Sequence, residues 1–157
     1  MVENKKARCH KCNLELVDDP EVCPLCGTAL YPHGVSREIM LMNKVRTTYN
    51  MVFCAEYLDI DTREVNELIA STRDLMGTDD LDSAEELITK AMNSVCVPLE
   101  KALSKELSDI HRMLRKKEVF GRDVSRFKDL LRGANSALAD KDYDTCLAII
   151  DSIKKNF

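Results

Sequence analysis

The sequence predicts two parts, a short cysteine-rich module over residues 1–35 and an all-α domain over residues 36–157. The first prediction rests on two Cys-x-x-Cys pairs that lie within the first 27 residues. The second rests on apolar residues that recur every three or four positions beyond residue 36, interrupted only by Pro98 and three glycines. Because no alternation of β-branched residues persists there, we expect a four- or five-helix bundle or an array of helical hairpins.

The cysteine pairs have the spacing of a metal-ligand set. Ten residues separate the two pairs, which are Cys9 with Cys12 and Cys23 with Cys26. Each Cys-x-x-Cys turn directs two thiolates toward one point, so the four sulfurs can complete a tetrahedron, as in structural zinc sites. The position after each pair commonly takes a positive φ, and it is occupied by the two residue types that best tolerate this conformation, Asn13 and Gly27.

This stretch resembles a short zinc ribbon of the double zinc-knuckle type, in which CPLCG is the more typical knuckle and CHKCN the looser one. The resemblance covers roughly the first 33 residues and implies one structural Zn²⁺ per chain. The spacer is shorter than in longer ribbons, which disfavours a transcription-factor type of role. The alternatives are a rubredoxin-like iron site, which uses the same four thiolates, a disulfide and a redox pair.

The cysteine set favours a structural role for the metal over a catalytic one. Four thiolates close the coordination sphere and leave no position for a substrate. His10 and His33 are therefore expected on the surface and not among the ligands. The chain has no glycine-rich phosphate loop, no Gly-x-Ser-x-Gly elbow and no His-Glu-x-x-His motif, and His111 stands alone in a helical pattern. We therefore expect no enzymatic activity.

Length and composition fit one domain plus a small metal-dependent module. The 157 residues are 45% hydrophobic and 32% charged, as is typical of a folded chain. No apolar run approaches the length of a membrane span, and the start lacks an export signal, so the sequence predicts a cytoplasmic protein with no membrane partner. Cys54, Cys96 and Cys146 lie far apart in helical apolar patterns, and we expect them to be reduced core residues.

Capping signals and apolar periodicity predict where the first two helices lie. Ser36 is a candidate N-cap for a helix that runs to about Leu58. Asp61, with Glu64 three positions later, forms a candidate capping box that opens a second helix. We expect Gly77 to end that helix.

Three further helices are expected in the rest of the chain. A second capping box, with Asp82 as the cap, opens a third helix, whose apolar positions keep their phase across Pro98. Because a loop would normally reset that phase, we expect one kinked helix to about Lys117. Asp123 is the expected cap of a fourth helix and Asp144 that of a fifth, which runs to the C-terminus.

A weak internal repeat aligns residues 67–88 with residues 129–150 at an offset of 62. Both segments have the pattern of a helix, a tight acidic turn and a second helix. The turn DYDTC, residues 142–146, resembles the helical-hairpin turn of tetratricopeptide-like repeats. The match is local, and the alternative is generic similarity, because any two antiparallel helix pairs need a capped turn and inward apolar residues.

The net charge of −4 is the sum of segments of opposite sign. Residues 56–90 contain eleven acidic side chains against three basic ones, a net of −8. Residues 111–132 contain eight basic side chains against three acidic ones, a net of +5. Such segments attract each other within a fold or attract partners of opposite charge.

Together these features predict a zinc-binding adaptor whose partner is a protein of unknown identity. The first alternative is a nucleic-acid-binding zinc-ribbon protein, in which basic residues beside the metal act with the segment 111–132. Those residues are Lys5, Lys6, Arg8 and Lys11. Acidic residues in the same module and the scarcity of aromatic residues disfavour this alternative. The second alternative is a rubredoxin-like redox protein.

Overall fold

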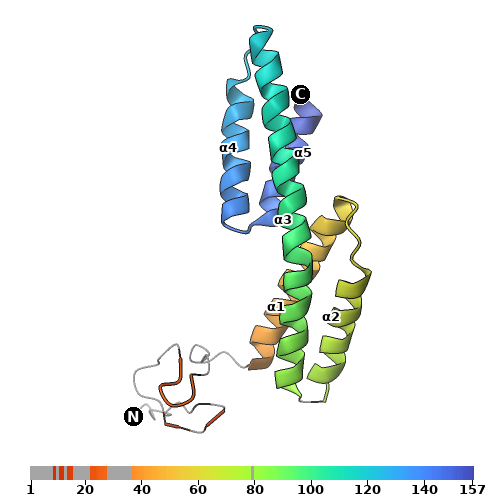
Figure 1. The fold of residues 1–157 in the computed structure, drawn as a ribbon, viewed down its shortest axis with the longest axis vertical. Coiled ribbons are helices and arrows are strands. Elements are labelled where there is room, and N and C mark those ends of the chain that lie inside the picture. Colours follow the sequence, from red (N-terminus) through yellow and green to blue (C-terminus); the bar gives the residue numbers. More distant parts are fainter. Residues whose placement is uncertain (1–8, 10, 13, 16–21, 28–36, 79) are drawn as a thin grey trace, which may run out of the picture. The chain divides into compact units, whose positions relative to one another are not determined.

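A computed structural model describes residues 9, 11–12, 14–15, 22–27, 37–78 and 80–157 of the protein. In these residues the chain forms five helices and only isolated β-bridge positions near the cysteines, which confirms the all-α fold class. The helices, shown in Figure 1, are α1 (Arg37–Tyr57), α2 (Arg63–Met76), α3 (Leu81–Val119), α4 (Ser125–Ala139) and α5 (Tyr143–Asn156).

The chain divides into two compact units, Met1–Asn43 and Lys44–Phe157. The division falls inside α1, about two turns beyond the residue at which the sequence places the end of the cysteine-rich module. The second unit contains most of α1 and all the later helices.

The caps of α3 and α5 lie two residues earlier than the sequence predicts. Asp80, and not Asp82, accepts a hydrogen bond from the N–H of Ser83 at 3.2 Å. In the same way Asp142, and not Asp144, accepts from the N–H of Thr145 at 3.2 Å. The predicted caps lie inside the first turn, where a carboxylate faces the positive end of the helix dipole. The sequence alone does not distinguish the capping aspartate from an aspartate in the first turn when the two stand two residues apart, as they do at the start of both helices.

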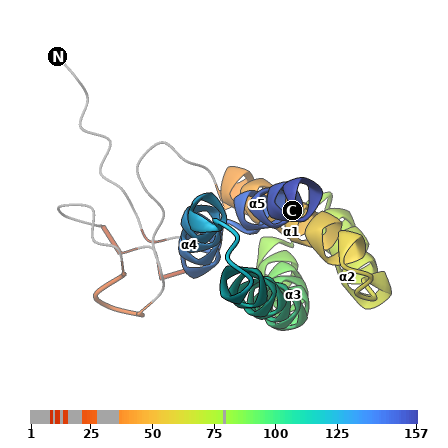
Figure 2. The same ribbon diagram turned by 90° about the horizontal axis from the view of Figure 1, so that it is seen from above.

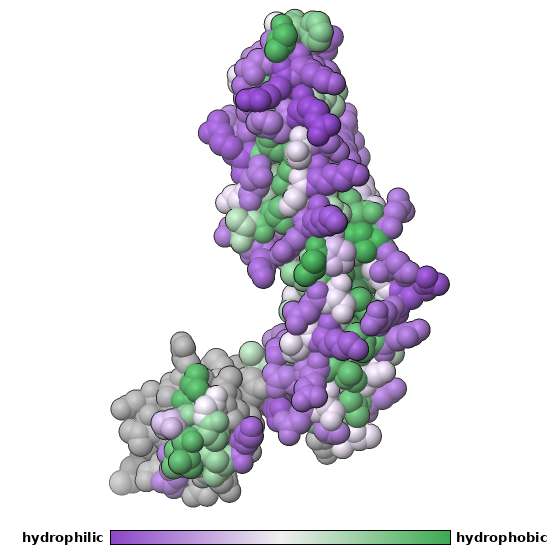
Figure 3. Space-filling model, in the orientation of Figure 1, coloured by the Kyte–Doolittle hydropathy of each residue, from purple (hydrophilic) through white to green (hydrophobic). Residues whose placement is uncertain are grey.

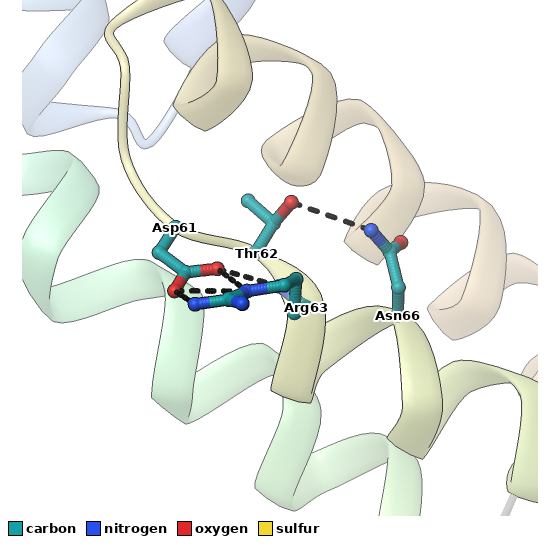
Figure 4. Close-up of polar contacts among 4 residues, drawn as sticks. All are labelled: Asp61, Thr62, Arg63 and Asn66. Carbon is teal, nitrogen blue, oxygen red and sulfur yellow. Dashed lines mark hydrogen bonds and ion pairs between the residues drawn. The ribbon is translucent and has the colours of Figure 1, made fainter.

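The predicted capping box of α2 is wrong by one residue. Thr62 is the N-cap, while Asp61 accepts from the N–H of Arg63 at 3.1 Å and pairs with its guanidinium at 2.7 Å, as Figure 4 shows. The Thr62 hydroxyl donates to Glu56 at 2.9 Å and accepts from the amide of Asn66 at 3.3 Å. The loop into α2 is thus closed by a two-residue aspartate turn and by a contact back to α1.

The start of α4 shows the same arrangement as the start of α2. The N-cap is Val124, not the predicted Asp123, and Asp123 accepts from the N–H of Ser125 at 3.0 Å. At the other end of α2, Gly77 is the C-cap, as predicted.

α3 runs without a break through Pro98, as its continuous apolar phase predicts. Its buried side chains follow one stripe: Ala84, Ile88, Ala91, Val95, Leu99, Leu103, Leu107, Ile110 and Leu114. At about 100° per residue, the stripe turns by about 160° around the helix axis between Ala91 and Leu107. The first half of α3 therefore packs on α2, and the second half, on another side, packs on α4 and α5 (Figures 1 and 2).

The second unit thus contains two helical bundles that share α3. The first bundle consists of α1, α2 and α3 up to Pro98, and the second of the rest of α3 with α4 and α5. In the first, two buried threonines are satisfied within their own helices, since Thr48 donates to the Lys44 carbonyl and Thr72 to the Leu68 carbonyl, each at 2.8 Å. In the second, Phe127 and Phe157 meet edge to face with their ring centres 5.0 Å apart.

Helix bounds in the two bundles recur after 62 residues. Three pairs of positions show this offset: the starts of α2 and α4 (Arg63 and Ser125), the starts of α3 and α5 (Leu81 and Tyr143), and the ends of α1 and α3 (Tyr57 and Val119). The residue two positions beyond each of these helix ends has a positive φ, 57° at Asp59 and 76° at Gly121.

Buried positions follow the same offset. The pairs that are buried in both bundles include Val45 and Leu107, Thr48 and Ile110, Val52 and Leu114, Ile69 and Leu131, and Ile88 and Ile150. The correspondence in structure therefore extends well beyond the segment that the sequence aligns. The tetratricopeptide-like character of the hairpin turn stays a prediction.

Candidate metal centre

The four predicted ligands, Cys9, Cys12, Cys23 and Cys26, lie together, with all their sulfur atoms within 4.8 Å of one another. Cys9 Sγ lies 3.6 Å from Cys26 Sγ, and Cys12 Sγ lies 3.5 Å from Cys23 Sγ. None of the four forms a disulfide, since these distances are far beyond the roughly 2.05 Å of a disulfide bond. They are close to about 3.8 Å, the edge of a tetrahedron with metal–sulfur bonds of about 2.3 Å.

Backbone hydrogen bonds close a turn around each cysteine pair. The N–H of Cys9 donates to the carbonyl of Leu14, and the N–H of Gly27 donates to the carbonyl of Cys23, each at 2.9 Å. Gly27 has a φ of 68°, as its place after the second pair predicts. Asn13, the matching residue after the first pair, lies outside the described residues. The first sulfur of each pair is buried and the second is half-buried.

The electrostatics of the cluster call for a cation. The pKa of Cys9 lies below its usual value, chiefly because the backbone N–H of Cys12 hydrogen-bonds its sulfur. The backbone N–H of Leu14 acts in the same direction on Cys12, but burial and the other three thiols raise the pKa of Cys12 to about 12. Because each thiolate opposes the ionisation of the next, four thiolates need a positive charge at their centre.

The donor set fits a closed, four-coordinate metal site. A metal bound by four thiolates would fix both turns around one point and supply the stability that a module of this size cannot draw from a core. Four sulfurs suit both Zn²⁺ and iron, so the arrangement defines a metal site and not the identity of its metal. No ligand position is left for a substrate, so such a metal would act on the fold.

Several residues singled out in the sequence lie outside the described part of the chain or on the surface. His10 and His33 are outside it, as are Lys5, Lys6 and Arg8 of the proposed nucleic-acid surface. Lys11 is described and exposed. His111 is exposed on α3.

The basic segment 111–132 covers the end of α3, the loop after it and the first half of α4. Half of its basic residues already have a partner: Arg112 with Asp109, Lys128 with Glu118, Arg132 with Asp129, and Lys117 with the carbonyl and the ring of Phe157. Within the described ranges, the other four have no acidic partner: Arg115, Lys116, Arg122 and Arg126. These four are exposed and form the part of the segment that is available to a binding partner.

Sequence reasoning missed a polar network where the two bundles meet. The Tyr143 hydroxyl donates to Glu100 Oε1 at 2.7 Å, and Cys96 Sγ lies 3.2 Å from that hydroxyl and 3.4 Å from the carboxylate. The hydrogen bond from Tyr143 is the main reason that the pKa of Glu100 lies below its ordinary value. Burial, with both neighbours, raises the pKa of Tyr143. An aromatic residue beside the acidic turn is visible in the sequence, but nothing there connects it to a glutamate 43 positions away.

A cavity of about 300 Å³ lies beside this network. Residues of α1, α3, the turn after α4 and the start of α5 line it: Thr47, Asn50, Met51, Met92, Asn93, Cys96, Lys141, Asp142, Tyr143 and Asp144. Its side chains are a mixture of amides, methionines and charged groups. Cys96 and Tyr143 are already engaged with Glu100.

The three remaining cysteines are free, as predicted. Cys54 and Cys146 are buried and Cys96 is half-buried. Burial, with the carboxylate of Asp144 that Cys54 Sγ approaches at 3.0 Å, raises the pKa of Cys54 to about 12. Burial also raises the pKa of Cys146. Cys54 and Cys146 are therefore neutral at physiological pH and are poor nucleophiles.

No protein-family model, curated protein or solved structure matches this chain. Among the described residues, no helix combines the length and the apolar character that a membrane crossing requires.

Proposed function

We propose that the protein is a zinc-binding adaptor, in which a zinc-held module and a helical domain offer surface to partner proteins. The observation that carries the proposal is the closed cluster of four sulfurs. A site of this kind stabilises a fold and leaves the surrounding surface for binding. We favour Zn²⁺ because four thiolates in a tetrahedron are its usual structural site, and a reducing cytoplasm as the compartment because it suits free thiols.

Exposed apolar side chains on the helices support an interaction role. Tyr49 and Phe53 lie four residues apart on α1, and each is at least partly open to solvent. Val119 and Phe120 are both 84% exposed where α3 ends. Contiguous exposed apolar residues with polar surroundings are typical of protein interaction sites.

The metal part of the proposal is tested by elemental analysis of the purified protein. We expect about one zinc per chain, and loss of that zinc when Cys23 and Cys26 are both changed to serine, because two thiolates cannot hold the site. The matched control changes Cys54 and Cys146 to serine, which leaves the cluster intact. Iron with a visible charge-transfer band would replace the zinc assignment with the rubredoxin-like alternative.

The adaptor part is tested by affinity purification from cells with nuclease treatment of the extract. We expect bound proteins to remain after nuclease treatment, since direct protein contacts do not depend on nucleic acid. Reciprocal capture by the purified candidate then establishes the pair. Loss of every bound protein on nuclease treatment would contradict the proposal.

Nucleic-acid binding is the second candidate, and it is favoured by the four basic side chains of the segment 111–132 that have no acidic partner among the described residues. If Arg115, Lys116, Arg122 and Arg126 each contacted a phosphate, affinity would fall about 150-fold between about 50 and 200 mM salt. We expect only weak, non-specific binding of duplex DNA or RNA at low salt. Sub-micromolar, salt-sensitive affinity that is lost when Arg115, Lys116 and Arg126 are changed to glutamate would make this the better function.

A further inference from the structure

We infer that the free end of the second bundle binds an acidic amphipathic helix of a partner protein. The inference rests on the proposed adaptor function and names its surface and its class of partner. The surface, called the tip, is the end of α3 with the loop to α4: Arg115, Lys116, Val119, Phe120 and Arg122.

The equivalent surface of the first bundle already has such a helix on it. The residues 62 positions before Lys116 and Val119 are Cys54 and Tyr57 at the end of α1. The Cys54 thiol donates to Asp144 Oδ1 at 3.0 Å, and the Tyr57 hydroxyl donates to both carboxylate oxygens of Asp151 at 2.7 and 2.8 Å. Since Asp144 and Asp151 are about two turns apart, they lie on the same face of α5. The acidic face of α5 therefore covers the end of α1, which is the equivalent of the tip in the first bundle.

The tip has the same backbone pattern as the end of α1, but its side chains are exposed. Lys116 is exposed, whereas Cys54 at the equivalent position is buried. In the loops, Leu58 is half-buried while its equivalent Phe120 is 84% exposed. Figure 3 shows apolar side chains at this end of the molecule with hydrophilic ones around them. The two surfaces differ in what covers them, so the tip is the place where a further helix would pack.

The chemistry of the tip selects the charge of that helix. Arg115, Lys116 and Arg122 have no acidic partner in the described part of the chain, and they lie beside Val119 and Phe120. Cations next to exposed apolar groups match a helix with carboxylates and apolar residues on one face. An anionic lipid surface would also match the positive charges of the tip. It would not, however, present two carboxylates at a fixed spacing of two helical turns, as α5 does toward α1. The observations therefore favour a protein helix over a membrane.

A peptide copy of α5 is the most direct probe, because it carries the face that occupies the equivalent surface. We would use residues 142–156 with Cys146→Ser, a fluorescent label, and a staple between positions 152 and 156, which are exposed in α5 and lie to one side of the face that carries Asp144 and Asp151. The control peptide has Asp144 and Asp151 changed to lysine. Anisotropy titrations would use the full chain, the variant Arg115→Glu with Lys116→Glu, and the variant Val119→Ser with Phe120→Ser. Lys90→Glu with Lys101→Glu is the matched charge control, since both lysines are exposed and lie far from the tip.

We expect saturable binding to the full chain, a loss of about tenfold or more in affinity for each tip variant, and an unchanged affinity for the lysine control. All the substituted residues are exposed, so circular dichroism should show the same helix content in every variant. Equal affinity of the wild type and the charge-reversed tip variant would overturn the inference, as would failure of the peptide to bind the wild type.

Sedimentation with vesicles of about 30% phosphatidylserine distinguishes binding of the tip to a membrane from its binding to a protein helix. Binding of vesicles but not of the peptide, lost in both tip variants, would also overturn the inference in favour of a lipid surface. A partner protein that is retained by the charge-reversed tip variant in affinity purification would leave the adaptor function standing and exclude the tip as its site.

Discussion

At the scale of single residues, the hydroxyl of Tyr143 joins α5 to α3 through one charged hydrogen bond, close to the junction of the two bundles. Tyr143 opens α5, while Glu100 lies in α3 two residues beyond Pro98. The tyrosine is only 7% exposed, so water cannot easily replace its bond to the carboxylate. Its hydroxyl therefore matters for stability in a way that an exposed tyrosine hydroxyl does not.

Tyr143→Phe should lower the free energy of unfolding by about 2 kcal/mol, because the hydrogen bond from a buried hydroxyl to a carboxylate is lost without a gain in packing. Tyr57→Phe is the control, since Tyr57 also donates to a carboxylate but is 54% exposed, and we expect little change there. Urea unfolding followed by circular dichroism measures both. Equal effects of the two substitutions would contradict the assigned role of burial.

The same bond should depend on pH in a defined direction. Tyr143 depresses the pKa of Glu100, so the bond contributes stability above the ordinary glutamate pKa of about 4.3 and loses it as pH falls through the depressed value. The difference in unfolding free energy between the wild type and Tyr143→Phe should therefore be constant near neutral pH and shrink in acid. A difference that grows as the pH falls would exclude the carboxylate as the partner.

At the scale of elements, the sequence predicts helix existence well and helix caps poorly. The order and approximate extent of all five helices follow from apolar periodicity, and the single helix through Pro98 follows from its unbroken phase. The caps of α3 and α5 are displaced by two residues because aspartates stand at alternate positions there. The caps of α2 and α4 are displaced by one residue because the aspartate before each cap accepts from a nearby N–H. Which residue becomes the cap depends on backbone torsions that composition does not determine.

Asp80→Ala should lower the free energy of unfolding by about 1 kcal/mol, since Asp80 is the cap that accepts from Ser83. Asp80→Asn keeps an acceptor at the same position and should have little effect. Thermal melts of the two variants provide the comparison. If both substitutions were equally harmful, the charge and not the cap would be the cause.

Pro98→Ala should raise the free energy of unfolding by roughly 1–3 kcal/mol. Proline in a helix interior removes one backbone hydrogen bond and crowds the preceding turn, and α3 continues on both sides of it. Val97→Ala, at the exposed neighbouring position, controls for local loss of side-chain surface. A lower stability of Pro98→Ala would indicate that the junction between the bundles requires the proline ring.

At the scale of the whole molecule, the sequence predicts which four cysteines come together, but it predicts the organisation of the helices only in part. The four cysteines come together because two Cys-x-x-Cys turns leave few other arrangements. That α3 belongs to two bundles could have been inferred from its spacing, since a buried residue at every fourth position makes the stripe drift around the helix. The full extent of the 62-residue correspondence could not, because buried pairs such as Thr48 with Ile110 share burial and not residue type.

The helical domain should fold independently of the metal. Residues 36–157 expressed alone should unfold in one cooperative transition with undiminished helix content, because a single buried stripe on α3 connects the cores of both bundles. Removing the metal from the full chain with a chelator should likewise leave the thermal transition of the helices in place, while proteolysis of the cysteine-rich module accelerates, since its fold depends on the metal. Limited proteolysis and circular dichroism on the same samples measure the two parts separately. Two resolved transitions in the fragment would mean that the bundles unfold independently, and a helical transition that follows the metal would mean that the module completes the helical core.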